Sequence, residues 1–227
     1  MASLAAVGVT GLVGSFFISL ARNATLPPDI THVVAISRKP VTANLSTGSN
    51  KVTNSVTPEL ISAIPSDVKV FFSSLGTTKA TAGSFEKQYA VDYTYNLELA
   101  KAAKAAGVST YILISSGGAA ADSYFAYPRM KGELERDVSA LNFDRTIIIR
   151  PGLIVGDRSD RRPAEAIAQS IYKGIRAIPG IGGSAVKSIG IPAEDIAKAA
   201  LVLLNKGGKG ASIHGNTELI KLAEEFK

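Results

Sequence analysis

The sequence predicts an α/β protein: a Rossmann-like, doubly wound parallel sheet with a small C-terminal substrate cap. Short apolar runs alternate with helical stretches, a glycine-rich turn follows the first run, and the pattern changes after Arg150. Runs that are apolar on nearly every residue are typical of strands buried on both faces, and their alternation with helices indicates parallel strands joined by right-handed crossovers. Ligands should then bind at the carboxyl ends of the strands.

The apolar runs and the stretches between them give the expected elements in order. Strands are expected at residues 4–7, 32–37, 51–54, 68–73, 110–115 and 145–150. Helices are expected at residues 12–23, 58–64, 85–106 and about 125–141. Residues 1–150 are therefore predicted to form an NAD(P)-binding Rossmann core.

Beyond Arg150 the alternation of strand and helix patterns stops. Pro151-Gly152 opens a charged loop, helices are expected near 164–175 and 193–204, and glycine-rich connectors occupy 180–183 and 207–210. We interpret residues 151–227 as a small substrate cap folded onto the same domain. Residues 40–50, rich in Thr, Ser and Asn, are expected to form an exposed loop.

Composition limits the possible functions. The 227 residues, 46% of them hydrophobic, can bury one large core. The absence of cysteine excludes disulfides and thiolate chemistry, and His32 and His214, which have no second ligand nearby in sequence, are expected to be structural rather than metal ligands. The net charge of +6 is diffuse and carries no nucleic-acid motif. Glycines interrupt the uncharged first 21 residues, so we expect no transmembrane helix there.

A glycine-rich segment lies between the first expected strand and the first expected helix. It reads Gly8-Val9-Thr10-Gly11-Leu12-Val13-Gly14, and every residue except Val9 is a candidate for binding a cofactor. Glycines permit a tight turn and close backbone approach, while the free N–H groups of a helix N-terminus can bind a pyrophosphate. The spacing differs from the usual G-x-G-x-x-G, so an incidental strand-to-helix turn is the alternative.

Two other strand ends supply further cofactor candidates. The second strand ends in Arg38-Lys39 instead of an acidic residue, and this pair can neutralise a 2′-phosphate, which favours NADPH or NADP over NADH. The alternative is a pair of exposed loop cations. The fourth strand runs into Leu75-Gly76-Thr77, where the glycine would let the backbone pass close to the adenosine part of a dinucleotide.

A Tyr-x-x-x-Lys pair, Tyr127 and Lys131, follows the fifth strand. Four residues make about one helical turn, so both side chains share a face, and an ammonium beside a phenol lowers the pKa of that phenol. Ser116 is the serine expected to act with them, with Ser115 as the alternative. This combination predicts a carbonyl reductase with a nicotinamide cofactor. The alternative is a surface pair that packs around the core.

The whole chain resembles an atypical short-chain dehydrogenase/reductase of the HIV Tat-interacting protein family, particularly its fungal mitochondrial outer-membrane members. The stretches that carry the resemblance are Gly8 to Gly14, Ser74 to Thr78, Val91-Asp92-Tyr93 with Asn96, Ser115-Ser116, Tyr127 to Glu133, Arg150-Pro151-Gly152, Gly156-Asp157-Arg158 and Arg162-Pro163.

The resemblance implies a role for each matching residue. Tyr127 would be the acid/base, Lys131 would bind the nicotinamide ribose and depress the tyrosine pKa, and Ser116 would hydrogen-bond the substrate carbonyl. Pro151, Gly152 and Leu153 would line the nicotinamide side, and Asn96 would support a proton-relay water. Pro128 directly follows the tyrosine, and we interpret it as a first-turn feature of the helix.

We expect an NADPH-dependent reductase of a small carbonyl compound whose identity the sequence leaves open. The alternative is an NADP(H)-binding regulatory or scaffold protein, and a third is a membrane adaptor that uses the basic loop 158–162 on anionic lipids. The resemblance implies a peripheral location on the cytosolic face of the mitochondrial outer membrane. It also suggests a homodimer formed through the helices at 85–106 and 125–141. No nucleic-acid partner is expected.

Overall fold

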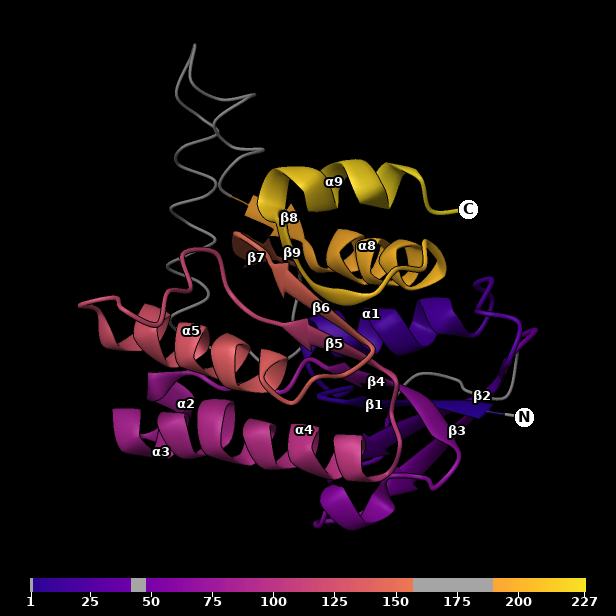
Figure 1. Cartoon of the computed structure of the whole chain (residues 1–227), viewed down its shortest axis with the longest axis horizontal. Helices are drawn as coiled ribbons and strands as arrows, with labels where there is room; N and C mark the ends of the chain where they lie inside the picture. Colours follow the sequence, from indigo (N-terminus) through magenta and orange to yellow (C-terminus); the bar gives the residue numbers. More distant parts are fainter. Residues whose placement is uncertain (1, 42–47, 157–189) are drawn as a thin grey trace.

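The computed structural model describes residues 2–41, 48–156 and 190–227. Its centre is a parallel sheet of seven strands in the order β3-β2-β1-β4-β5-β6-β9 (Figure 1). These strands are β1 Ala2–Val7, β2 Ile30–Ser37, β3 Lys51–Val56, β4 Val68–Ser73, β5 Thr110–Ile114, β6 Arg145–Arg150 and β9 Gly210–Gly215. The order reverses between β1 and β4, so the predicted doubly wound Rossmann-like sheet is confirmed.

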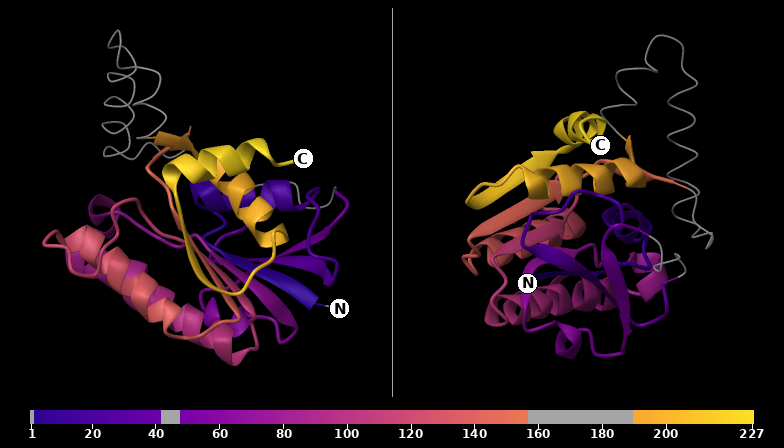
Figure 2. Two further views of the ribbon diagram at one scale, coloured as in Figure 1. Left: turned by 45° about the horizontal axis from the view of Figure 1, so that its top comes forward. Right: turned by 90° about the vertical axis from the view of Figure 1, so that its right-hand side faces the viewer.

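Helices cover both faces of this sheet. The described helices are α1 Leu12–Ala21, α2 Lys79–Ala82, α3 Phe85–Tyr89, α4 Asn96–Ala105, α5 Ala126–Ser139, α8 Ala193–Asn205 and α9 Asn216–Glu224. Figure 2 shows α1, α8 and α9 on one side of the sheet and α4 and α5 on the other. A separate two-stranded ladder pairs β7 Leu153–Val155 with β8 Gly190–Pro192.

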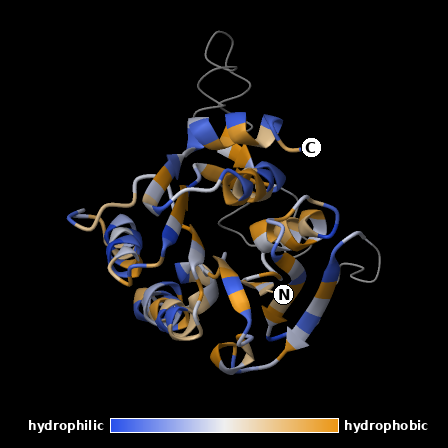
Figure 3. Ribbon diagram, turned by 45° about the vertical axis from the view of Figure 1, so that its right-hand side comes forward, coloured by the Kyte–Doolittle hydropathy of each residue, from blue (hydrophilic) through white to orange (hydrophobic). Residues whose placement is uncertain are grey.

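Two apolar layers hold the sandwich together, one on each side of the sheet. In the first, Phe17 of α1 stacks on Phe72 of β4 with 3.8 Å between ring centroids. In the second, Leu99 of α4 and Leu134 of α5 pack against Tyr111 of β5. The central strands are therefore apolar along their length, as Figure 3 shows in orange, because both faces are covered.

Three predicted elements need correction. Residues 58–64 form no α-helix, only a 3₁₀ turn at Ile61–Ala63, since the segment is short and Pro58 and Pro65 flank it. The single helix expected over 85–106 is α3 and α4 joined by a π-helical turn at Ala90–Tyr95. The short helix α2 had not been expected.

The C-terminal segment also differs from the prediction. Residues 210–215, of which only Gly210 had been assigned, to the expected connector 207–210, form β9, which pairs with β6 in the main sheet. The predicted helix at 193–204 is confirmed as α8, whose buried side belongs to the same core as α1. The boundary at residue 150 therefore does not separate the sheet from a cap. The features predicted at 158–162, 164–175 and 180–183, and residues 42–47, lie outside the described residues.

Candidate functional site

Two adjoining cavities lie at the carboxyl end of the sheet, where the fold places ligands. The glycine cavity, of about 260 Å³, is bordered by the turn after β1 and the loop after β4. The Pro151 cavity, of about 560 Å³, is bordered by the loops after β5 and β6. Both cavities include Leu12, Ser115 and Tyr127 in their walls, so they form one continuous groove.

Most of the predicted site residues line this groove. The glycine cavity contains Gly8, Thr10, Gly11, Leu12, Val13, Arg38, Leu75, Gly76, Thr77, Tyr127 and Lys131. The Pro151 cavity contains Ser116, Tyr127, Pro151, Gly152 and Leu153. The structure thus brings together residues from six different loops and helices. Gly14, Lys39 and Asn96 are not among the described residues that line either cavity.

The glycine-rich turn is shaped by contacts that exclude any side chain. Gly8 has a φ of 74°, and a Cβ atom on it would lie 2.4 Å from the carbonyl carbon of Ser74. A Cβ atom on Gly14 would lie 2.3 Å from the carbonyl oxygen of Gly8. Gly8 therefore lets the turn approach β4, whereas Gly14 acts from inside α1 by letting this helix pack against the turn.

The basic pair at the end of β2 is divided by the structure. Arg38 is exposed and borders the glycine cavity, while Lys39 is exposed on the turn that follows. The backbone carbonyl of Lys39 accepts a hydrogen bond of 2.7 Å from the Ser37 hydroxyl, which fixes this turn. Arg38 alone is thus in position to meet a phosphate in the groove.

Ser116 and Tyr127 meet at the junction of the two cavities. Tyr127 lies in the first turn of α5, where Pro128 is tolerated because its missing N–H would have no helical partner. Ser116 lies near enough to the phenol of Tyr127 to lower its pKa, and its own hydroxyl donates to the Gly117 carbonyl at 3.3 Å. The neighbouring Ser115 is buried, and its hydroxyl donates to the carboxylate of Glu135. Of the two serines left open by the sequence, Ser116 is therefore the one that acts on the tyrosine.

The expected lowering of the Tyr127 pKa is not observed. Its pKa is raised above the ordinary value, chiefly because burial of the phenol disfavours the phenolate. The nearby Ser116 hydroxyl acts in the opposite direction, and the negative charge of Asp92 raises the pKa further. A tyrosine in this state is held as a neutral phenol, which is the form that donates a proton.

Lys131 follows one turn later on the same face of α5 and is 4% exposed. Burial lowers its pKa, while the charges of Asp92 and Glu135 act to raise it. Among the described residues, none lies within hydrogen-bond or salt-bridge distance of its ammonium group. The N–H groups of this ammonium are therefore available to donate hydrogen bonds to a ligand in the groove.

Asp92 is a site residue to which the sequence analysis had given no role. It is buried in the π-helical turn, lines the glycine cavity, and accepts a hydrogen bond of 2.6 Å from the backbone N–H of Thr77. Burial raises its pKa, and the positive charge of Lys131 opposes this effect. The wider π-helical turn directs this carboxylate toward the groove. The sequence pattern did not predict this turn.

Asn96, predicted to support a proton-relay water, has a structural task. Its side-chain carbonyl accepts a hydrogen bond of 2.8 Å from Ser73, and its amide donates to the Leu75 carbonyl at 3.2 Å. These bonds hold the end of β4 and the start of its loop. The relay role implied by the resemblance stays a prediction.

The groove has the features that a nicotinamide dinucleotide requires. A ten-residue helix starts at a turn that is free of side chains at its closest approach, so its first N–H groups can meet a pyrophosphate. The buried ammonium of Lys131 faces the same groove from the opposite wall, where ribose hydroxyls would accept hydrogen bonds from it. Gly76 also lines the groove, and a Cβ atom on it would lie 3.8 Å from the Asp92 carboxylate, which is an ordinary van der Waals contact.

The fold and the groove together define a protein of the Rossmann-like, doubly wound α/β class. The sequence comparisons are more specific: a model of the family described as HIM1 matches residues 32–175, and this chain belongs to that family. Curated relatives named "Protein fmp52, mitochondrial" confirm the resemblance to the fungal members. The protein of Aspergillus fumigatus is 46% identical over 190 residues, covering 81% of this chain and 76% of its own length.

Two further relatives match almost from end to end. The fmp52-1 protein of Aspergillus terreus is 37% identical, covering 99% of this chain and 100% of its own length. The FMP52 protein of Kluyveromyces lactis is 37% identical, covering 96% and 97%. Both names include the word mitochondrial. Within the described parts of the chain, every helix is too short or too polar to span a bilayer.

Solved structures with the same fold include enzymes bound to NAD or NADH. MoeE5 in complex with UDP-glucose and NAD matches with a TM-score of 0.65 and 16% identity, covering 98% of this chain and 81% of its own. The Bordetella bronchiseptica enzyme WbmF in complex with NADH matches with a TM-score of 0.63 and 14% identity, covering 99% and 75%. The likeness to these structures therefore extends to the fold alone.

Proposed function

We propose that the protein is an NADP(H)-dependent oxidoreductase that reduces a small carbonyl compound. The observation that carries the proposal is the arrangement around the start of α5: Tyr127 and Ser116 border the same cavity, with the buried ammonium of Lys131 one turn away. The cofactor would occupy the glycine cavity, and the substrate would enter through the Pro151 cavity.

The chemistry divides between the cofactor and the side chains. A bound NADPH would supply the hydride that the carbonyl carbon receives. Ser116 would orient the carbonyl oxygen, and Tyr127, a neutral phenol at neutral pH, would give this oxygen its proton. Its raised pKa makes the phenol a weaker acid, so a positive charge beside it, such as that of Lys131, would be needed to favour the transfer. Lys131 would also bind the ribose hydroxyls. Pro151 and Leu153 limit access of water to the reacting carbon from the other side of the groove.

Replacement of Tyr127 by phenylalanine tests the mechanism. We expect Tyr127→Phe to reduce NADPH oxidation with a panel of aldehydes, ketones and quinones by about 10²–10⁴-fold, the usual contribution of a general acid. The melting-temperature rise with NADPH should stay nearly unchanged, since the ring remains. The matched control is Tyr124→Phe, which removes a hydroxyl from a residue that is 99% exposed three positions earlier. Full turnover by Tyr127→Phe would contradict the proposal.

The second candidate is an NADP(H)-binding regulatory or scaffold protein without turnover. Two adjacent aromatic side chains beside the groove favour it, because Tyr124 and Phe125 are 99% and 77% exposed and contact no core. A thermal-shift titration with NADPH, NADP, NADH and NAD separates the candidates. A selective NADPH or NADP shift with turnover of the panel supports the enzyme. The same shift without turnover supports the scaffold.

We propose a mitochondrial location, on the basis of the names of the relatives. Peripheral attachment to the cytosolic face of the outer membrane and pairing of two copies through α4 and α5 stay predictions. Fractionation of mitochondria with carbonate extraction and protease treatment would test the first. Light scattering of the purified protein would test the second.

A further inference from the structure

A buried carboxylate, Glu135, lies one turn beyond Lys131 on the same face of α5. Its side chain is 5% exposed. Arg150 donates to both of its oxygens, with Nε lying 3.0 Å from Oε1 and 3.1 Å from Oε2, and Nη2 also bonds Oε2. The Ser115 hydroxyl donates to Oε1. One carboxylate thus accepts charge-assisted bonds from two different strands.

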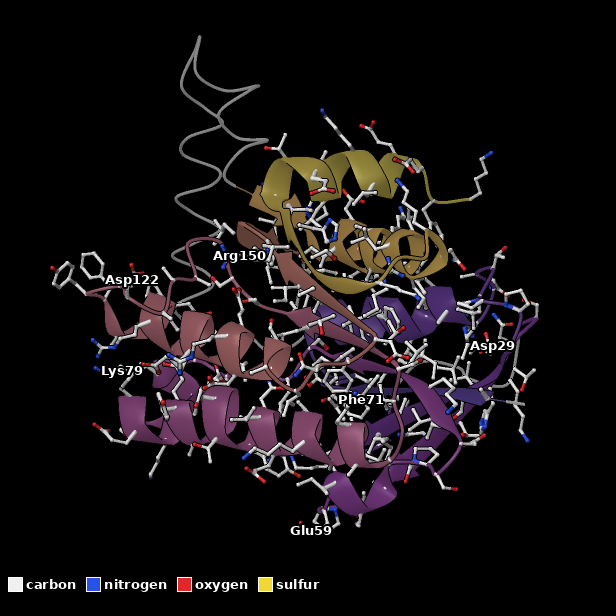
Figure 4. The ribbon with its side chains drawn as sticks, viewed as in Figure 1. Asp29, Glu59, Phe71, Lys79, Asp122 and Arg150 are labelled. Carbon is white, nitrogen blue, oxygen red and sulfur yellow. The ribbon has the colours of Figure 1, made fainter. Side chains whose placement is uncertain are left out.

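Each donor directly precedes a loop of the groove. Ser115 stands immediately before Ser116, and Arg150, labelled in Figure 4, stands immediately before Pro151. The two loops are also joined to each other, because the Gly117 N–H donates to the Pro151 carbonyl at 2.7 Å. Glu135 is consequently the point at which both loops are tied to the helix that carries Tyr127.

The Glu135–Arg150 ion pair is not expected to add much to the stability of the fold. Removing a carboxylate and a guanidinium from water costs about as much free energy as their attraction returns, and apolar replacements of the same volume are commonly as stable. A bidentate guanidinium–carboxylate pair, however, fixes the distance and the angle between its partners more closely than apolar contacts do. Such precision matters most where two loops must meet a reacting group.

We propose, on the basis of the oxidoreductase function proposed above, that Glu135 is a positioning residue for the reaction. Through Ser115 it sets the place of Ser116 against the Tyr127 hydroxyl. Through Arg150 it sets the place of Pro151, Gly152 and Leu153 on the substrate side of the groove. It touches neither substrate nor cofactor itself, and the phosphate-binding part of the groove does not depend on it.

A triple variant separates the effect of Glu135 on the position of the two loops from its effect on the stability of the protein. In Ser115→Ala/Glu135→Met/Arg150→Met, apolar side chains replace all three partners, so no buried donor is left without its acceptor. We expect its melting temperature to stay within about 3 °C of the wild-type value, as for other apolar replacements of buried ion pairs. NADPH affinity should change by less than about 3-fold, while turnover of the carbonyl panel should fall about 10²-fold, the scale of an error of 1 Å in placement.

The nearness of Ser116 to Tyr127 gives a readout that needs no substrate. Protein labelled with ¹³C at tyrosine Cζ reports the surroundings of the phenol through the Tyr127 resonance, which Tyr127→Phe assigns among the seven tyrosines. Ser116→Ala defines the shift that follows loss of the serine hydroxyl. The triple variant should move the resonance toward this value. Asp137→Asn is the control, because Asp137 lies on α5 and accepts from Tyr93 at 2.6 Å but borders neither cavity.

The outcomes distinguish the two proposals. An unmoved Tyr127 resonance in the folded triple variant overturns the positioning role. The role is also overturned if turnover recovers whenever the melting temperature recovers, because stability alone would then explain the loss. If the triple variant does not fold, Glu135→Gln, which keeps the shape of the side chain but lacks the second acceptor oxygen, is measured in the same way and judged by the same shift. Absence of turnover in the wild-type protein counts against the oxidoreductase function alone, since the resonance is read without substrate.

Discussion

At the scale of single residues, α5 presents three polar groups on successive turns. Tyr127 is 41% exposed as a residue, but desolvation of its phenol raises its pKa; Lys131 is buried beside the groove, and Glu135 accepts hydrogen bonds from Arg150 and Ser115. The raised pKa of the tyrosine and the lowered pKa of the lysine share one cause, since desolvation disfavours the charged form of each. The tyrosine therefore carries the proton that the proposed reduction would transfer.

Arg38 should determine the preference for NADPH. Because Arg38 borders the groove and Lys39 does not, we expect Arg38→Ala to lower the ratio of NADPH to NADH affinity by about 10- to 100-fold, the worth of one charge-assisted phosphate contact. Lys39→Ala is the matched control and should leave the ratio nearly unchanged. Parallel fluorescence titrations with both cofactors measure it. Equal losses in the two variants would indicate a general charge effect, and an unchanged ratio in Arg38→Ala would refute its role.

At the scale of elements, the loop after β5 is pressed against α5. The Ala120 N–H donates to the Pro128 carbonyl at 3.1 Å, which ties this loop to the first turn of the helix. A Cβ atom on Gly132 would lie 2.3 Å from the carbonyl carbon of Ala120 and equally close to the Ala121 nitrogen. The glycine thus permits the approach that brings Ser116 to Tyr127.

Gly132→Ala should therefore disturb both the fold and the site. The added methyl group meets backbone atoms, so the loop must shift, and we expect a loss of about 1–3 kcal/mol in the free energy of unfolding together with weaker turnover. Urea unfolding measures the first. Gly215→Ala is the control, because a Cβ atom there has nothing within 4 Å and the φ of −89° suits any residue. A stable and active Gly132→Ala protein would show that the loop is not held at this contact.

At the scale of the whole molecule, the buried ammonium of Lys131 lowers the stability of the folded state. The pKa of Lys131 is lowered by burial, so the folded protein binds the ammonium proton less tightly than the unfolded chain does. The charged lysine therefore destabilises the folded state at every pH below its folded pKa. That penalty disappears as the pH rises from the lowered value to the ordinary value of 10.5.

Lys131→Met should stabilise the protein near neutral pH while abolishing turnover. The gain in melting temperature should be largest at about pH 7 and should shrink at about pH 10, because the wild-type lysine loses its charge over that range. Thermal unfolding at the two pH values measures it. Lys101→Met, whose ammonium is 51% exposed, is the control and should change stability by less than about 0.5 kcal/mol. A gain that does not depend on pH would contradict the explanation by burial.

Much of the fold was readable in the sequence because its signals are local. Six strands of the main sheet were predicted within a few residues, since strands covered on both faces must be apolar throughout. The edge strand β9 was missed because Gly210–Gly215 is exposed or only partly buried, and a strand of this kind needs no apolar run. The π-helical turn was missed because a wider helical turn has no distinct pattern of side chains.

By itself, the sequence determined the class of fold, the glycine turn and the Tyr-x-x-x-Lys pair, because each depends on the spacing of residues that are close in the chain. Only the tertiary structure decided that Ser116 and not Ser115 lies beside Tyr127, that Arg38 and not Lys39 borders the groove, that Asp92 approaches Lys131, and that Arg150 and Ser115 bind Glu135. These arrangements bring together segments that are separated in the chain. They depend on the register of strands and the rotation of α5, which packing of the whole core sets.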